Sequence, residues 1–432
     1  MKNLSIAIRC ETMAKSEASE NDKSEVDLKP LYMRSVVNSL GVGMVTPFMG
    51  DYANRLGASP TEMGWFQSSS NLSNNVMQVY WGRLSDRLGR RIPFIVLGGL
   101  IIAGLWIPIM FVTNPSQLII LLVVQALLGS MATPVWTALI GDLVPSFRLG
   151  RINANINLWA SIGSLIATLA SGVITLSVGG TVREMFFIPF IVAAVSGLVA
   201  SLVMFFVKEK KSNEKINLKE RFASEIFDVW KHARKTPNFL KYCYVAGFFE
   251  FFMSISWPLI PITRMTILNA AMLHVALLTV VQSIVTIIFQ TWAGRLADTV
   301  GRKPLLVLFR FGLVSVPIAY AFTPNIETLI GVSAFWGILM ALGQVAVTAY
   351  LLDVSPEVHR GSFIALFNLM MGVASFFGSL LGGYLSDYMQ HLFGSIVIGV
   401  QIVYMISTVG RIIGATLHLK LEETLNRRAV NF

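Results

Sequence analysis

The sequence has 432 residues, of which 54% are hydrophobic and only 13% are charged, and its formal net charge at pH 7 is +10. The charged share is about half of that in an average soluble protein, which excludes a disordered chain and most soluble folds. The two cysteines, Cys10 and Cys243, are too few and too far apart for a disulfide framework or a cysteine-rich metal site.

Apolar runs of membrane-spanning length recur along the whole chain. About 20 apolar residues are enough to cross a bilayer as a helix, so the sequence predicts an all-α membrane protein with twelve transmembrane helices. The predicted spans are 32–54, 61–82, 92–112, 117–142, 150–178, 184–207, 238–264, 270–293, 304–322, 327–352, 360–386 and 393–419.

Polar segments divide the chain into five parts. They are a disordered cytoplasmic tail (1–30), a six-helix bundle (31–207), a cytoplasmic linker (208–237), a second six-helix bundle (238–420) and a cytoplasmic tail (421–432). Within the linker, residues 218–230 place apolar side chains on one helical face. This pattern indicates an amphipathic helix on the inner leaflet, with a helix that binds a partner protein as the alternative.

The basic residues are strongly biased toward one side of the predicted spans. With the N-terminus inside, 29 of the 34 Lys and Arg residues lie on the inner side, and only Arg55, Arg183 and Arg264 lie on the outer side. Arg310 and Arg411 fall inside spans 9 and 12. By the positive-inside rule, this asymmetry predicts that both termini are cytoplasmic. Because these charges are dispersed between apolar segments, we expect no nucleic-acid binding.

Two motifs recur at nearly the same offset along the chain. The segment from Gly82 to Arg91 is matched 212 positions later by the segment from Gly294 to Lys303. Asp142, with Pro145 and Gly150, is matched 211 positions later by Asp353, with its own proline and glycine. The two matches indicate a duplicated six-helix unit, an arrangement used by many transporters.

At these residues the chain resembles the major facilitator superfamily. The Gly-x-Leu-x-Asp-x-x-Gly-Arg-Arg/Lys loop is that family's specific signature, and here it follows spans 2 and 8. The resemblance implies two six-helix bundles around a central cavity that opens alternately to each side.

The repeated motifs predict a conformational latch. Asp86 and Asp298 can accept hydrogen bonds from arginines or from helix N-termini, and Gly89 and Gly301 allow a tight turn. The alternative is that the arginines only set the topology. The residues assigned to the latch are Gly82, Asp86, Gly89, Arg90, Arg91, Asp142, Gly294, Asp298, Gly301, Arg302 and Asp353.

Spans 1, 4, 7 and 10 are expected to line the cavity most directly. The side chains predicted to face the solute are Asn38, Gln125, Trp136, Trp257, Trp336 and Gln344. The aromatic surroundings of span 7 suit an apolar or amphipathic solute, although they also suit ordinary helix packing.

Glu250 is the acidic residue placed deepest inside a span. Such a carboxyl could load and release a proton as the cavity changes sides, so we assign it to proton coupling or cation recognition. A protonated Glu250 bonded to a neighbouring helix is the structural alternative. For Arg310 and Arg411 we expect a structural role rather than a substrate-anion site.

These features predict a proton-coupled exporter of a small organic solute, acting as a monomer in the plasma membrane. A metabolite or sugar importer of the same superfamily is the main alternative, and a receptor or membrane enzyme on the same fold is a third reading. Gln125 stands four residues before Gly129, where proton-driven drug exporters carry an arginine. This difference leaves open whether the chain belongs to the drug-exporter branch of the superfamily. We expect no metal site, no cofactor and no ATP drive, because the sequence lacks a phosphate-binding loop motif.

Overall fold

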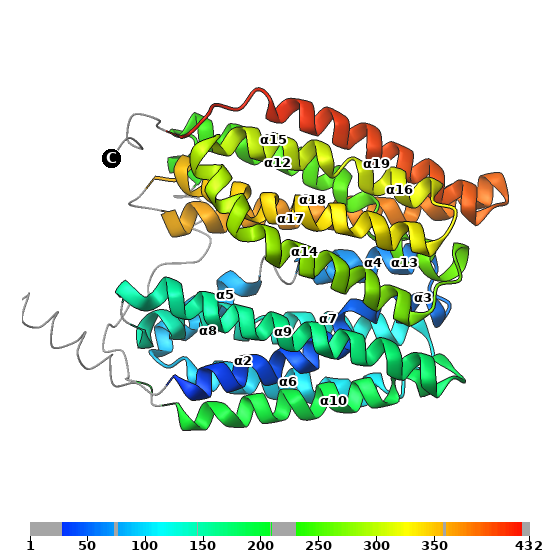
Figure 1. The fold of residues 1–432 in the computed structure, drawn as a ribbon, viewed down its shortest axis with the longest axis horizontal. Coiled ribbons are helices and arrows are strands. Elements are labelled where there is room, and N and C mark those ends of the chain that lie inside the picture. The colour runs from blue at the N-terminus through cyan, green and yellow to red at the C-terminus, as the bar shows by residue number, and fades with distance from the viewer. Residues whose placement is uncertain are drawn as a thin grey trace, which may run out of the picture.

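A computed structural model describes residues 28–72, 77–144, 146–207, 209, 230–356 and 360–425 (Figure 1). Every regular element in this part of the chain is a helix. Most of the predicted tail 1–30, all but the last residue of the predicted amphipathic helix 218–230, and residues 426–432 lie outside the described residues.

The first six spans form one bundle, which we call the N half. Its elements are α2 (Lys29–Val45), η1 (Thr46–Phe48), α3 (Met49–Arg55), α4 (Pro60–Leu72), α5 (Gln78–Leu88), α6 (Ile92–Ile109), α7 (Pro115–Gly129), α8 (Ala132–Leu143), α9 (Ser146–Val178), α10 (Val182–Val203) and η3 (Met204–Phe206).

The last six spans form a second bundle, which we call the C half. Its elements are α12 (Pro237–Ile255), α13 (Leu259–Ile262), η4 (Thr263–Ile267), α14 (Met272–Thr299), α15 (Arg302–Gly312), α16 (Ser315–Phe322), α17 (Ile326–Val354), α18 (Arg360–Phe393) and α19 (Ile396–His418).

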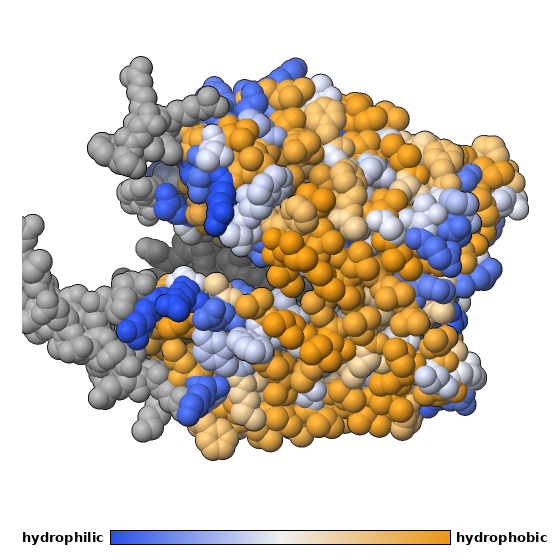
Figure 2. Space-filling model, viewed as in Figure 1, coloured by the Kyte–Doolittle hydropathy of each residue, from blue (hydrophilic) through white to orange (hydrophobic). Residues whose placement is uncertain are grey.

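The twelve predicted spans are confirmed by the helices. Ten helical segments in the described residues are long and apolar enough to cross a membrane, and the first two spans are covered by α2 with α3 and by α4 with α5. Figure 2 shows apolar side chains around the middle of the molecule and hydrophilic side chains at its two ends. We call the end where α2 begins and α19 ends the terminal face, and the other end the opposite face.

Several spans are interrupted where the sequence weakens the helix. Pro47 lies in the turn η1 between α2 and α3, and Pro258 follows the end of α12. A proline cannot donate the backbone hydrogen bond that continues a helix. As a result, spans 1 and 7 change direction near the opposite face.

Two helix pairs form the largest contacts between the halves. Helix α4 packs against α18, and α9 packs against α14 (Figure 1). Among the described residues, the polar contacts between the halves cluster near the opposite face. At the terminal face, by contrast, the surface is hollowed between the halves (Figure 2).

Candidate functional site

A cavity of about 700 Å³ lies between the halves. Most of its wall comes from the N half, and the C half contributes the segment from Trp257 to Arg264. Its polar lining includes Asn38, Thr46, Gln67, Ser70, Asn71, Gln125 and Thr133, and its aromatic lining is Phe66, Trp106 and Trp257. Arg264 is the one charged side chain among the described residues of the wall. The cavity therefore offers hydrogen-bonding amides, aromatic surface and a single cation.

The broken part of span 7 brings Trp257 and Arg264 to this cavity. After α12 ends at Ile255, the chain continues through Pro258 into the short helix α13 and the wide turn η4. Trp257, Ile260, Pro261 and Arg264 follow one another at helical spacing, and all four line the cavity. The break thus turns one face of the end of span 7 toward the N half.

The cavity is closed at the opposite face by an ion pair between the halves. Arg264 Nη2 donates a hydrogen bond of 2.8 Å to Asp51 Oδ2, and the side chain of Asp51 is fully buried while that of Arg264 is 14% exposed. Arg55 Nη2 donates to the Ala270 carbonyl at 2.8 Å, and Thr266 donates to Asn54 at 2.9 Å. These bonds join α3 to the end of span 7 and the loop after it.

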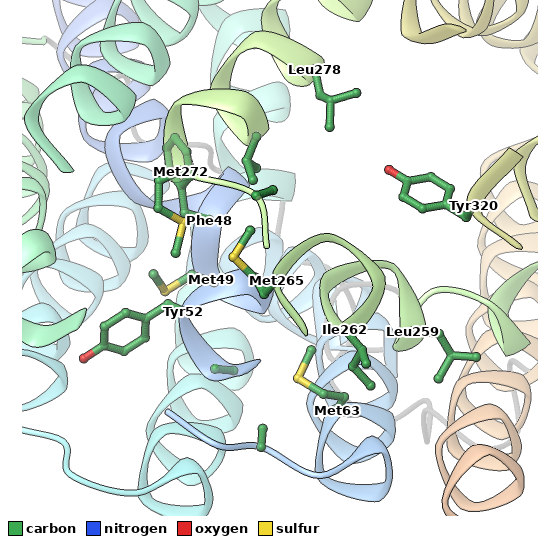
Figure 3. Close-up of a cluster of buried hydrophobic side chains, with 14 of the residues drawn as sticks. Phe48, Met49, Tyr52, Met63, Leu259, Ile262, Met265, Met272, Leu278 and Tyr320 are labelled. Atoms are coloured by element: carbon green, nitrogen blue, oxygen red, sulfur yellow. The ribbon is translucent and has the colours of Figure 1, made fainter. Parts of the chain in front are cut away.

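Apolar side chains from both halves pack together in the segments that carry Asp51 and Arg264. Figure 3 shows Phe48, Met49 and Met63 of the N half with Ile262 and Met265 of the C half, and all five are buried in one core cluster. Flexible methionine side chains fill irregular gaps well. This apolar seam seals the opposite face without requiring a rigid fit.

Next to the seam, α4 and α18 approach each other at two glycines. A Cβ added at Gly383 would lie 2.5 Å from the Pro60 carbonyl oxygen and 2.9 Å from Gly64 Cα. Thr61 bonds to Asp387 through its hydroxyl and its backbone amide, the latter at 3.2 Å. A side chain larger than hydrogen at Gly383 would therefore require α4 and α18 to move apart.

The repeated loops at the terminal face form ion pairs within each half. Arg91 pairs with Asp142, and Arg302 Nη1 lies 2.5 Å from Asp353 Oδ2. In the repeat, Asp142 matches Asp353, but Arg302 matches Arg90 rather than Arg91. The equivalent carboxylates thus pair with arginines one register position apart, and each pair links the start of a span to the end of the next span.

The other latch residues are distributed around the same face. Gly89 and Gly301 have φ values of 60° and 121°, a region that favours glycine. Arg90 and Asp298 are exposed, while the side chain of Asp86 lies outside the described part of the chain. A Cβ at Gly82 would make ordinary contact with Pro134 at 3.5 Å, and one at Gly294 would meet nothing within 4 Å.

Sequence reasoning missed two acidic residues that complete these loops. The Glu209 carboxylate accepts hydrogen bonds from the amides of Arg91 and Ile92, the latter at 3.1 Å. The Glu423 carboxylate accepts from the amides of Arg302 and Lys303 at 3.1 and 3.2 Å. Each glutamate follows the last span of its half and satisfies amides at the start of that half's third span, which have no partner within the helix.

The six predicted cavity residues are found in different places. Asn38, Gln125 and Trp257 line the cavity, whereas Trp136, Trp336 and Gln344 are not among its described lining residues. The Arg34 guanidinium lies 3.9 Å above the Trp136 ring.

The two cavity candidates on span 10 instead contact neighbouring helices of the C half. Trp336 Nε1 donates to Ser315 Oγ at 3.1 Å and its ring stacks on Tyr320. Gln344 accepts a hydrogen bond from Gln290 at 3.4 Å.

Glu250 also lies outside the described cavity wall. It is partly buried in α12 and interacts electrostatically with Arg310 and Arg411. Two arginines on spans 9 and 12 therefore lie within electrostatic reach of the carboxyl, which the sequence did not reveal.

Arg411, on span 12, connects the interrupted segments of spans 7 and 9 in the C half. It is 1% exposed and donates to the Leu313 carbonyl at 2.7 Å, to the Met253 carbonyl at 3.0 Å and to Ser256 Oγ at 2.5 Å. Leu313 and Met253 lie where spans 9 and 7 are interrupted, so their carbonyls accept long backbone bonds of 3.3 and 3.4 Å from residues three positions on instead of regular helical bonds. A cation at the C-terminal end of a helix is also favourable, and this arrangement supports the structural role expected for Arg411.

Comparison with known proteins gives matches along nearly the whole chain. The family model described as Major Facilitator Superfamily matches residues 31–257 and 245–429. An uncharacterised MFS-type transporter of Methanocaldococcus jannaschii is 23% identical over 422 residues, which cover 93% of this chain and 99% of the relative. The multidrug resistance protein MdtG of Proteus mirabilis is 29% identical over 194 residues, or 44% of this chain and 46% of that protein. A variant of the nucleoside transporter NupG has a similar structure, with a TM-score of 0.73 and 16% identity over 91% of this chain and 100% of that one.

Proposed function

The chain belongs to the major facilitator superfamily of membrane transporters, and we propose that it moves a small organic solute by alternating access, as a proton-coupled exporter of apolar or amphipathic compounds. The observation that carries the proposal is the cavity between the halves, sealed at the opposite face and facing a hollow at the terminal face. A site that is closed to one side only is what an alternating-access transporter requires.

The cavity lining supports a solute of mixed character. Phe66, Trp106 and Trp257 offer aromatic surface, while Asn38 and Gln125 offer hydrogen bonds. Binding sites of this kind hold an apolar body by packing and fix its orientation through a few polar groups. An amphipathic compound fits both parts of the wall.

The direction of the hollow follows from the charge pattern of the chain. Most of the Lys and Arg residues that the structure describes lie at the terminal face, and the positive-inside rule places such a face in the cytoplasm. We therefore place both termini in the cytoplasm and the protein, as a monomer, in the plasma membrane. In this orientation the structure is an inward-facing state.

Proton coupling is assigned to Glu250. This carboxyl lies within a span, beside the two arginines of spans 9 and 12. Ionisable groups inside a membrane are costly and mark ion or proton pathways in transporters. A change in the protonation of Glu250 would alter its attraction to Arg310 and to Arg411, and Arg411 binds the carbonyls at the interruptions of spans 7 and 9.

Partial similarity to the multidrug resistance protein MdtG supports export. The alternative is import of a polar metabolite, and the amide-rich part of the cavity wall favours it. The two functions differ in the direction in which the solute moves against its gradient.

The test is transport by the purified full chain in proteoliposomes of known orientation. A panel of amphipathic drugs, nucleosides and sugars is measured for uptake and efflux, with and without a pH gradient. Export requires gradient-driven movement of an amphipathic compound away from the terminal face. Gradient-driven movement of a nucleoside or sugar toward that face supports import, and no movement of any solute contradicts transport.

A further inference from the structure

The single cation of the cavity is only partly satisfied by its partner. Arg264 donates one hydrogen bond to Asp51 through Nη2. Arg264 Nε and Asp51 Oδ1 are both buried and have no hydrogen-bond partner among the described residues. A buried polar atom without a partner costs about 1–3 kcal/mol. In the closed pair, Arg264 and Asp51 therefore each keep one atom that can form a further hydrogen bond.

We propose that the transported solute carries a carboxylate or a similar anionic group, which binds Arg264 in place of Asp51. This inference rests on the proposed transport function and specifies the class of solute. Guanidinium groups bind planar anions through two parallel hydrogen bonds. An anion can use both Nε and Nη2 once the guanidinium turns its buried Nε toward the cavity, whereas Asp51 uses Nη2 alone.

The rest of the wall fits the other end of such a solute. Trp257 stands seven residues before Arg264 and lines the same cavity, together with Phe66 and Trp106. An anionic group at Arg264 would place an attached apolar or aromatic body against these rings. The solute class is therefore an amphipathic organic anion.

Replacement of Asp51 by the solute at Arg264 also links solute binding to the closure of the opposite face. Asp51 belongs to the N half and Arg264 to the C half, so their bond joins the two halves. An anion that takes the place of Asp51 removes this bond while keeping the guanidinium paired. Asp51 and the solute are thus competitors for one cation, and removing the carboxylate must strengthen anion binding.

The test compares matched probes on the purified full chain. Benzoate, 1-naphthoate and octanoate are each measured against the corresponding neutral amide, by thermal stabilisation and by equilibrium binding. The wild type should prefer the acids to the amides. Asp51→Asn should bind at least one of the acids about tenfold more tightly, which is about 1.4 kcal/mol. The double variant Asp51→Asn/Arg264→Gln, which leaves no unpaired buried charge, should lose the preference for acids.

Three outcomes would overturn the proposal. They are equal binding of acids and amides by the wild type, unchanged or weaker acid binding by Asp51→Asn, and a retained preference in the double variant. A purely structural ion pair predicts weaker binding in both variants, which is the opposite sign for Asp51→Asn. If the acids do not bind but neutral solutes are still transported in proteoliposomes, the transport function stands and the anion site does not.

Discussion

Glu209 and Glu423 have the same role in the two halves, because each carboxylate accepts hydrogen bonds from two consecutive amides at the start of a span. Glu209 caps α6, which starts at Ile92, and Glu423 caps α15, which starts at Arg302. Each cap also fastens the chain that leaves the last span of a half to the third span of that half. The duplication therefore extends beyond the repeated loops to the residues that stabilise them.

Replacing these glutamates should destabilise each half independently. Removal of a helix-capping side chain costs about 0.5–2 kcal/mol, so we expect Glu209→Ala and Glu423→Ala to lower the free energy of unfolding by that amount. The double variant should show the sum, because distant sites are usually additive. Thermal unfolding in detergent measures the effect. Glu422→Ala, which removes one hydrogen bond to Asn238, is the control and should change stability less.

The ion pair between Arg302 and Asp353 should matter more than its counterpart in the N half. Both side chains of this pair are 23% exposed, whereas Asp142 is 55% exposed. Asp353 also accepts a hydrogen bond of 2.6 Å from Thr424. Because exposed ion pairs contribute little, Asp353→Asn should slow solute exchange more than Asp142→Asn.

A charge swap separates the ion pair from the other contacts of Asp353. The double variant Arg302→Asp/Asp353→Arg should recover part of the exchange rate lost in Asp353→Asn. Recovery would support a role in switching between states. Equal rates in Asp142→Asn, Asp353→Asn and wild type would contradict the latch.

The spans could be predicted because a run of about twenty apolar residues has the length and the composition that a transmembrane helix needs. The interruptions were harder to predict. Pro47, Pro258 and Pro317 signal breaks in spans 1, 7 and 9, but the partner of the carbonyl freed in span 9 is not local. There the Leu313 carbonyl is satisfied by Arg411, a residue 98 positions away, and no local pattern reveals such a contact.

The cavity could be predicted only in part, because some of its residues are brought together by contacts between distant parts of the sequence. Asn38, Gln125 and Trp257 were found from their positions on spans 1, 4 and 7. Arg264 was assigned to an outer loop, although its spacing of seven from Trp257 places both residues on one helical face. The role of Asp51 depends on how the two halves meet, and that contact joins residues 213 positions apart.

The orientation of the chain can be tested with two exposed positions. In a background with Cys10→Ser and Cys243→Ser, Ser177→Cys lies at the opposite face and Lys420→Cys at the terminal face. An impermeant maleimide added to intact cells should label the first and not the second, because the positive-inside rule places the basic face in the cytoplasm. Labelling of Lys420→Cys alone would reverse the orientation and make the hollow outward-facing.

Glu250→Gln should uncouple transport from the proton gradient. The amide cannot exchange a proton, so gradient-driven accumulation in proteoliposomes should be lost while downhill movement of the solute continues. Glu327→Gln, an exposed carboxyl in the first turn of α17, is the control and should behave like the wild type. A Glu250→Gln protein that still concentrates solute with the wild-type pH dependence would assign Glu250 to packing beside Arg310 and Arg411.

The contact between Gly64 and Gly383 should control which face of the cavity is open. A Cβ at Gly383 would meet backbone atoms of Pro60 and Gly64 at 2.5–2.9 Å, while a Cβ at Gly64 would meet neighbours at 3.1 Å. Small residues allow helices to approach closely in membranes, so Gly383→Ala should destabilise the state with the opposite face closed. Gly64→Ala should have a smaller effect. Gly331→Ala, with nothing within 4 Å, should have none.

The readout is the accessibility of the cavity from the opposite face. Asn38→Cys lines the cavity, and its labelling by an impermeant reagent from that face should be about tenfold faster in the Gly383→Ala background. A tenfold change corresponds to about 1.4 kcal/mol between the two states, which is within the range of the cost of overpacking. The effect on the labelling rate should decrease in the order Gly383, Gly64, Gly331, because the neighbouring atoms are farther away at each successive position. Equal labelling in all three backgrounds would mean that α4 and α18 stay packed while the opposite face opens elsewhere, at the ion pair of Asp51 and Arg264.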